Sequence, residues 1–199
     1  YAVTVRAMAE SARTASRQMV ALTDARKRDA LVAVADALDT DRAMILAANA
    51  RDMQAARRQQ LAPALVERLA IDTKLGTVTA AVRQVAGMKD PVGAVQWRRR
   101  LDDGLILSRV ARPLGVLGIV FESRPDALVQ IVSLCLKSAN AVILKGGSEA
   151  AHTNRQLFAT IEGALAGEPA YAGAMQLMTT REDVRQLLSL DDLVDLIIP

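Results

Sequence analysis

The chain has 199 residues, of which 51% are hydrophobic and 24% charged, a composition typical of a globular protein rather than a disordered one. Its formal net charge is only +3, and aromatic residues make up 3% of it, too few for the stacking that nucleic-acid bases need. With one cysteine and one histidine, the chain has neither an intrachain disulfide nor an ordinary thiolate–imidazole zinc site. We therefore expect no nucleic-acid partner and no bound metal.

The sequence also argues against a membrane protein. No run approaches the roughly eighteen apolar residues of a spanning helix, and the N-terminus lacks the charged-then-apolar pattern of a signal peptide. The single cysteine fits a reducing compartment. These features predict a soluble, cytoplasmic protein. The first residue is Tyr1 rather than methionine, which we interpret as the mark of a trimmed or partial sequence.

The first ninety residues have the spacing of helices on the outside of a domain. Thr23 is suited to cap a helix whose apolar side repeats at Leu31, Val34, Ala35 and Leu38. Three further helices are expected. One is capped by Thr40 or Asp41 and turns Ile45, Ala48 and Met53 to one side, one starts near Pro63, and one runs from Asp72 or Thr73 towards Met88.

The pattern changes near residue 90. Residues 92–99 and 105–110 read as two strands joined around Asp102, Asp103 and Gly104, which is a hairpin signal. Arginines on such a hairpin are compatible with a solvated edge that resists pairing or with a contact between subunits. The sequence alone leaves these two alternatives open.

From residue 115 onward, strands and helices alternate. The runs "GVLGIVFE", "AVILK", "AGAMQLMT" and "VDLIIP" read as strands, and helical segments separate them. Alternation at this spacing predicts an α/β domain with a parallel, Rossmann-like sheet, right-handed crossovers and helices on both faces. Its strand-to-helix turns then lie at one edge of the sheet, where open α/β sheets hold their ligands.

The turn after "AVILK" is the first candidate binding site. Gly146 and Gly147 would let a ligand approach the backbone, and Lys145 adds a positive charge. Ser148 and Glu149 open the following helix, whose unpaired N–H groups favour an anion. An ordinary turn with a solvated lysine is an equally good interpretation of the pattern, and Glu149 is also explained as an acid that complements the helix dipole.

The turn "FESRPD" after the preceding strand is the second candidate. Arg124 is a planar cation beside a helix start, which suits a phosphate or a carboxylate. For Ser123, the pattern favours capping of that helix over hydrogen bonding to a reacting carbonyl. Cys135 lies on an apolar helix with no cationic neighbour and is interpreted as structural, and His152 as a surface residue.

One long run, "RPLGVLGIVFESRPDALVQIVSLCLKSANAVILKGGSEAAHTN", resembles the γ-glutamyl phosphate reductases, also called glutamate-5-semialdehyde dehydrogenases, of the aldehyde dehydrogenase superfamily. Weaker similarity extends through the N-terminal helices and to "VDLIIP", so it covers nearly the whole chain. Ala139 departs from the family pattern, which commonly has glycine there.

The resemblance implies reduction of γ-glutamyl phosphate by NADPH to glutamate 5-semialdehyde and phosphate, in proline biosynthesis, through a cysteine thioester. It implies that Lys145, Gly146, Gly147, Ser148 and Glu149 contact the adenosine end of NADP(H). Ser123 would stand where ordinary aldehyde dehydrogenases place an oxyanion-stabilising asparagine, and Arg124 is the candidate contact for the substrate. The resemblance further implies a homo-oligomer and association with glutamate 5-kinase.

The expected organisation is a helical layer over residues 1–91, a hairpin for oligomerisation over 92–112 and a cofactor-binding core over 113–199. By the resemblance, the catalytic cysteine lies beyond Pro199, and Cys135 does not match its position. We therefore expect no catalytic residue in this chain and no activity from it alone. The alternatives are a stand-alone nucleotide-binding or assembly module, another superfamily member acting on an ordinary aldehyde, and part of a bifunctional kinase–reductase.

Overall fold

A four-stranded parallel sheet forms the centre of the molecule, as seen in a computed structural model that describes residues 4–199. The strands are β3 (Val116–Val120), β4 (Ala141–Lys145), β5 (Met175–Met178) and β6 (Leu196–Ile198). Their spatial order is β5-β4-β3-β6, and every neighbouring pair is parallel. The predicted α/β class and parallel sheet are confirmed.

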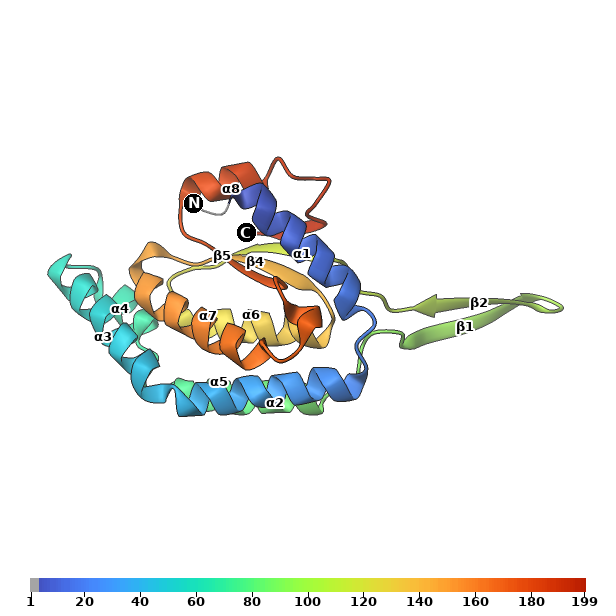
Figure 1. The fold of residues 1–199 in the computed structure, drawn as a ribbon, viewed down its shortest axis with the longest axis horizontal. Helices are drawn as coiled ribbons and strands as arrows, with labels where there is room; N and C mark the ends of the chain where they lie inside the picture. Colours follow the sequence, from blue (N-terminus) through green and yellow to red (C-terminus); the bar gives the residue numbers. More distant parts are fainter. Residues whose placement is uncertain (1–3) are drawn as a thin grey trace.

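Helices cover both faces of this sheet (Figure 1). On one face lie α6 (Pro125–Lys137) and α7 (Ala151–Leu165), with α2 (Asp24–Thr40) and α5 (Leu75–Gly87) packed outside them. On the other face lie α1 (Val5–Met19) and α8 (Arg181–Leu187). Because α1 packs directly on β3, β4 and β5, it is not part of the outer layer that the sequence pattern predicts for the first ninety residues.

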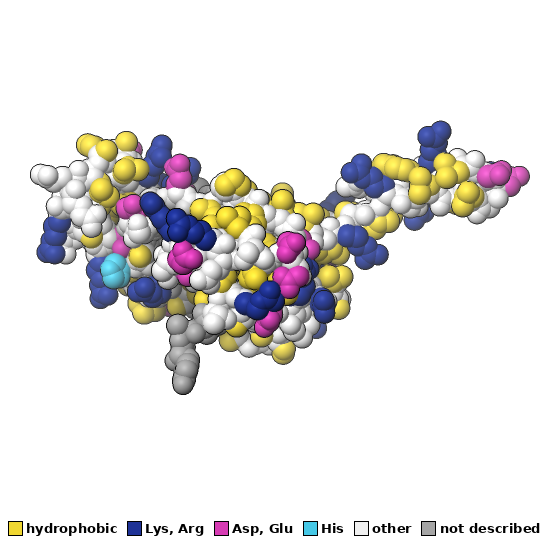
Figure 2. All heavy atoms as spheres, turned by 90° about the horizontal axis from the view of Figure 1, so that it is seen from above, with side chains coloured by type: hydrophobic (Ala, Val, Ile, Leu, Met, Phe, Trp, Pro, Cys, Tyr) yellow, Lys and Arg dark blue, Asp and Glu magenta, His cyan; other side chains and the backbone are white. Residues whose placement is uncertain are grey.

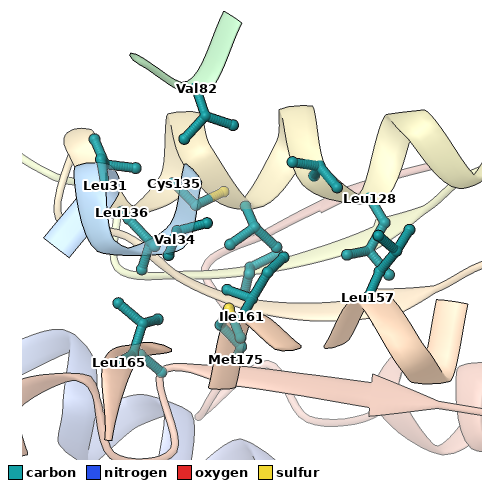
Figure 3. Packing of buried hydrophobic residues seen from close by; sticks show 14 of the residues in the cluster. Leu31, Val34, Val82, Leu128, Cys135, Leu136, Leu157, Ile161, Leu165 and Met175 are labelled. Atoms are coloured by element: carbon teal, nitrogen blue, oxygen red, sulfur yellow. The ribbon is translucent and has the colours of Figure 1, made fainter. Parts of the chain in front are cut away.

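The strand β4 shows why the sheet is buried on both sides. Its side chains alternate between the faces, so Val142 and Leu144 join the core under α6 and α7, while Ile143 joins the core under α1. Figure 3 shows the first of these cores, in which Leu31 of α2 and Leu157 of α7 pack together with Leu128, Leu136 and their neighbours. A strand with no polar face can only be stable between two such layers.

The predicted apolar side of α2 is confirmed, because Leu31, Val34, Ala35 and Leu38 are buried. Thr23 caps this helix, its hydroxyl oxygen accepting the N–H of Arg26.

The next two helices are α3 (Arg42–Arg58) and α4 (Pro63–Leu69), and the capping predicted for α3 is wrong. Asp41 does occupy its N-cap position but makes no capping bond, and its carboxylate accepts the Thr160 hydroxyl of α7 at 2.7 Å. The buried side of α3 also centres on Asn49 and Asp52, while Ala48 and Met53 are only half-buried.

A bidentate ion pair fastens α1 to the sheet. Arg13 donates to both carboxylate oxygens of Asp195, just before β6, at 2.8 and 3.1 Å. The same carboxylate accepts the backbone N–H of Val116 at 2.7 Å, and the Asp195 N–H donates in return to the Val116 carbonyl at 2.9 Å. One side chain therefore joins α1, β3 and the approach to β6.

The turn between α6 and β4 contains Ala139 in a left-handed conformation, with φ = +57°. Only glycine adopts this region without strain, and it is the usual residue where a helix ends this way. The geometry is therefore one that favours the glycine that the resemblance leads us to expect here.

The antiparallel hairpin of β1 (Val95–Asp102) and β2 (Leu105–Val110) projects away from the sheet (Figure 1). Every residue of both strands is exposed, including Trp97, Leu101, Leu105 and Ile106. Figure 2 shows hydrophobic side chains interspersed with Lys and Arg along this projection. The predicted hairpin is confirmed. Among residues 4–199, no helix combines the length and apolar character needed to cross a bilayer.

Candidate functional site

The two turns singled out in the sequence meet at the carboxyl edge of β3 and β4. The Ser123 hydroxyl, in the turn after β3, donates to Glu149 Oε2, in the turn after β4, at 2.6 Å. The backbones after the two strands are also hydrogen-bonded, since the Phe121 N–H donates to the Lys145 carbonyl at 3.0 Å. Ser123 and Glu149, which are 26 positions apart in the chain, are therefore in direct contact.

Glycine is required in the turn after β4 because two neighbours fill the space that a side chain would take. A Cβ on Gly147 would overlap the Ser123 hydroxyl oxygen and lie 2.8 Å from Glu149 Oε2. A Cβ on Gly146 would overlap the Asn154 amide nitrogen and lie 2.8 Å from the ring of Phe121. The two glycines therefore allow the two turns to come together.

Lys145 brings a positive charge to this junction, where Glu149 and Asp183 feel its field but do not form a salt bridge with it. Its side chain is buried, and its ammonium donates to the Gly146 carbonyl at 2.6 Å. Within residues 4–199 it forms no salt bridge. A buried cation whose partner is a carbonyl favours a bound anion nearby, because burial without a counter-charge costs free energy.

The start of the helix after β4 differs from the prediction. A short 3-10 turn, η1 (Ser148–Ala150), precedes α7, and Asp52 of α3 already occupies the end of α7. The Asp52 carboxylate accepts the N–H groups of His152 and Thr153 at 3.1 and 2.7 Å, and the Thr153 hydroxyl at 2.6 Å. The first N–H groups of α7 are therefore not free for a ligand.

The free donors lie at the predicted helix start and one residue before it. Among the described residues, the backbone N–H groups of Gly147 and Ser148 have no acceptor. They follow Lys145 in the chain, so the unpaired donors that an anion would need lie in the glycine segment rather than in the first turn of α7.

Capping of α6 by Ser123 is not observed. Arg124 occupies the N-cap position, with no side-chain capping bond, and Ser123 donates to Glu149 instead. The Arg124 guanidinium, about half exposed, pairs with Asp126 at 3.2 Å, and the other oxygen of that buried carboxylate has no partner in the described part of the chain. The structure therefore brings Ser123 to the glycine turn but holds Arg124 against its own helix.

Glu149 is held as a carboxylate by its surroundings. The Ser123 hydroxyl is the largest cause that lowers the pKa of Glu149 below its usual 4.5, and the Glu149 backbone N–H, Ser148 and Lys145 act in the same direction. Glu149 is therefore more than a dipole-complementing acid, because it joins the two turns.

A depression opens beside the glycine turn, and Ser123 does not line it. Its accessible volume is about 70 Å³, and its lining includes Gly146, Gly147, Ser148, Asn154 and Arg155, with residues 177–179 after β5. Asn154 is buried, and its Oδ1 has no hydrogen-bond partner among the described residues. A larger hollow, of about 660 Å³, runs along α3, but the two turns do not line it.

Cys135 and His152 lie outside this constellation. Cys135 is buried in the core under α6, and burial raises the pKa of its thiol to about 12. The His152 side chain is exposed. Within residues 4–199, no group of His, Cys, Asp and Glu side chains has the geometry to hold a metal ion.

Sequence reasoning missed the polar network between α3 and α7. The Asn49 amide donates to the Leu69 carbonyl at 2.8 Å and to the Thr153 hydroxyl at 3.1 Å, beside the three bonds of Asp52. The available signal was two polar residues, Asn49 and Asp52, at helical spacing with the buried Ile45. Their partners lie about a hundred positions away, so the pattern alone does not identify them.

No family model matches the chain, but both its sequence and its fold are similar to those of known proteins. A γ-glutamyl phosphate reductase from Natronomonas pharaonis is 48% identical over 98% of this chain, and one from Synechococcus elongatus is 46% identical over 99%. This chain covers 45% and 46% of those two proteins, so it spans less than half of their length.

Solved structures agree with the sequence relatives. The γ-glutamyl phosphate reductase from Thermotoga maritima matches 98% of this chain and 48% of its own, with a TM-score of 0.92 and 34% identity. The enzyme of that name from Saccharomyces cerevisiae matches all of this chain and 51% of its own, with a TM-score of 0.92 and 35% identity. A benzaldehyde dehydrogenase from Corynebacterium glutamicum, 17% identical with a TM-score of 0.77, shares the fold. The chain is thus a relative of the γ-glutamyl phosphate reductases, with the fold of the aldehyde dehydrogenase superfamily, over about half of their length.

Proposed function

We propose that this chain is the N-terminal part of an NADPH-dependent reductase that converts γ-glutamyl phosphate to glutamate 5-semialdehyde and phosphate, a step of proline biosynthesis. The relatives that carry this enzyme name support the reaction, since they match nearly all of the chain. The observation that carries the proposal is the junction of the two turns, where the Ser123–Glu149 bond occurs in the same turn as a buried Lys145 that forms no salt bridge in the described chain.

The residues at this junction fit a phosphorylated dinucleotide. Lys145 supplies a cation, the N–H groups of Gly147 and Ser148 supply free donors, and the glycines leave room for close approach. At an effective dielectric constant of about 20, two opposite unit charges roughly 4 Å apart attract by about 4 kcal/mol before desolvation. The proposed role of residues 145–149 is therefore to hold the adenosine end of NADP(H).

The proposed chemistry divides between this chain and the rest of the reductase. A cysteine thiolate of the longer protein displaces phosphate from the acyl carbon, and the resulting thioester is reduced to the aldehyde, which returns the thiolate. NADPH, when bound, supplies the hydride for that reduction. The Ser123 hydroxyl is proposed to donate to the acyl oxygen, for which it would have to give up its hydrogen bond to Glu149.

Arg124 is proposed to contact the acyl phosphate or the carboxylate of the substrate. Its guanidinium is about half exposed and pairs with one oxygen of Asp126, so it has donors to spare. In the longer reductase, Arg124→Ala should raise KM or lower kcat, and unchanged values of both would remove Arg124 from the site.

Cys135 is not proposed as the nucleophile. It is buried, and with a pKa near 12 less than one thiol in ten thousand is ionised at pH 7. We therefore expect the 199-residue chain to show no reductase turnover by itself, and reproducible turnover by the purified chain would contradict this.

Isothermal titration of the chain with NADPH, NADH and ATP tests the cofactor site. NADPH should bind best, and Lys145→Met should weaken it at least tenfold because the buried cation is lost. Lys89→Met is the matched control, since Lys89 is exposed and far along the chain from the turns, and it should stay within twofold of the unchanged chain. A preference for ATP would favour the alternative, a nucleotide-binding module without reductase chemistry.

A homo-oligomer joined through the hairpin also belongs to this proposal. Its support is that the apolar side chains of β1 and β2 are exposed rather than buried within the described chain. Association with glutamate 5-kinase remains a proposal from the resemblance.

A further inference from the structure

The depression beside the glycine turn has a basic lining. It contains no carboxylate, and Arg155 is its one charged residue. Glu149 lines a separate hollow of about 190 Å³, together with Asp52 and His152. The acid and the arginine therefore border different hollows, and Ser148 lines both.

Arg155 is available to a ligand at this depression. It lies on the second turn of α7, is exposed, and forms no ion pair with any residue in the range 4–199. Its neighbour Asn154 lines the same depression with a buried Oδ1 that lacks a partner. A buried acceptor without a donor is costly, which points to a ligand that donates a hydrogen bond there.

Glu149 does not line this depression. A carboxylate that accepts both ribose hydroxyls selects a cofactor without a 2′-phosphate, whereas a nearby arginine accommodates the phosphate. Here the Ser123 hydroxyl donates to Glu149 Oε2 at 2.6 Å. The acid that would repel a 2′-phosphate is therefore directed to the other turn.

From this arrangement, and resting on the proposed function, we infer that Arg155 is the specificity-determining residue that binds the 2′-phosphate of the adenosine ribose. The depression, with an accessible volume of about 70 Å³, takes the 2′-phosphate and the ribose edge that carries it, and Asn154 is the acceptor for a donor of the ligand there. A guanidinium offers a planar pair of donors that matches a phosphate, which a single ammonium does not.

The test measures binding of 2′,5′-ADP and of 5′-AMP to the chain by isothermal titration. These probes share the adenosine 5′-phosphate and differ by the 2′-phosphate alone. The unchanged chain should prefer 2′,5′-ADP by at least tenfold. Arg155→Gln should abolish that preference and leave 5′-AMP within twofold, and Arg155→Lys should recover part of it. Arg58→Gln is the matched control and should keep the preference. Arg58 ends α3, is exposed and forms no ion pair with the described residues.

The outcomes separate this inference from the function on which it rests. Equal binding of the two probes by the unchanged chain, or an undiminished preference in Arg155→Gln, overturns the role of Arg155 while leaving a dinucleotide site at Lys145 intact. Failure of both probes to bind a folded chain overturns the cofactor site itself, and the inference with it. A preference that falls with Arg155→Gln and with added salt supports the inference.

Discussion

The core strand β4 and the hairpin strand β2 are built from similar residues and lie in opposite surroundings. All five residues of β4 are buried, whereas all six residues of β2, among them Leu105, Ile106 and Leu107, are exposed. Hydrophobic sequence therefore gives both strands their extended conformation but does not fix what covers them. In β4 the cover comes from helices of the same chain, while in the hairpin the described chain offers none.

The difference teaches where this molecule's stability resides. Burial of apolar area stabilises a fold by roughly 25 cal/mol per Å², and that gain exists only where surface leaves water. Residues of the sheet and of α6 and α7 contribute it, while the apolar residues of the hairpin stay exposed in the described chain. Exposed apolar surface beyond scattered single residues is one feature of interaction sites, which is why the hairpin is tested for association below.

The sharpest test of the comparison is truncation in the core. Leu144 of β4 is fully buried between the sheet and its helices, so Leu144→Ala leaves a cavity as well as losing transfer free energy. We expect a loss of about 2–5 kcal/mol in the free energy of unfolding, measured by urea titration. A loss below about 1 kcal/mol would mean that this core collapses around the gap.

The next largest loss of stability is expected when the hydrogen bonds that Asp52 makes to α7 are removed. Asp52→Ala removes three hydrogen bonds from the start of α7 and leaves two N–H groups of a buried helix end without partners. The expected loss is about 1–3 kcal/mol in the free energy of unfolding. Asp29→Ala on α2, where the carboxylate is exposed, is the matched control and should change it by less than about 0.5 kcal/mol. Equal effects from the two variants would show that Asp52 does not anchor α7.

A smaller, pH-dependent effect is expected at the junction of the turns. The Ser123 hydroxyl lowers the pKa of Glu149, so the bond contributes stability above pH 4.5 and loses it as the pH falls through the lowered value. Ser123→Ala should destabilise the chain by less than about 1 kcal/mol at pH 7, because Glu149 is partly exposed to screening solvent, and by still less at pH 3. Urea titrations at both values measure this.

The control for this prediction is Thr14→Ala, which removes a hydroxyl bonded to the neutral Glu10 carbonyl. Its effect should be the same at both pH values. A Ser123→Ala effect that does not change with pH would show that the hydroxyl does not act through the Glu149 carboxylate.

The smallest effect on unfolding is expected in the hairpin. Ile106 is 64% exposed, so Ile106→Ala should change the free energy of unfolding by less than about 0.5 kcal/mol. If the hairpin joins subunits, the same variant should weaken association in sedimentation equilibrium, whereas the core variant should not act there directly. A large loss of stability at a concentration where the chain is monomeric would contradict the comparison.

The sequence predicts the parallel sheet well because its signal is local. Continuous apolar runs such as "AVILK", followed by glycine and a helical pattern, indicate buried strands without reference to the rest of the chain. Thr23 and Pro63 likewise mark helix starts by rules that act over three or four residues.

The candidate site is predicted less completely because its contacts are not local. Ser123 looks like a cap in the sequence, and only the approach of the second turn gives its hydroxyl a better acceptor in Glu149. Asp52 looks like a surface acid of α3, and only the packing of α7 makes it a buried cap. These roles depend on distances between elements, which neither periodicity nor capping rules specify.

The ion pair between Arg13 and Asp195 has a consequence for the order of folding. Its partners are 182 positions apart, so α1 leaves the ribosome long before the acid that fastens it has been made. At roughly 5–20 residues per second, that delay is about 10–40 s. During this interval α1 lacks the ion pair that fastens it to the sheet, and its apolar side is exposed. A chaperone that covers this side during synthesis would protect it from aggregation.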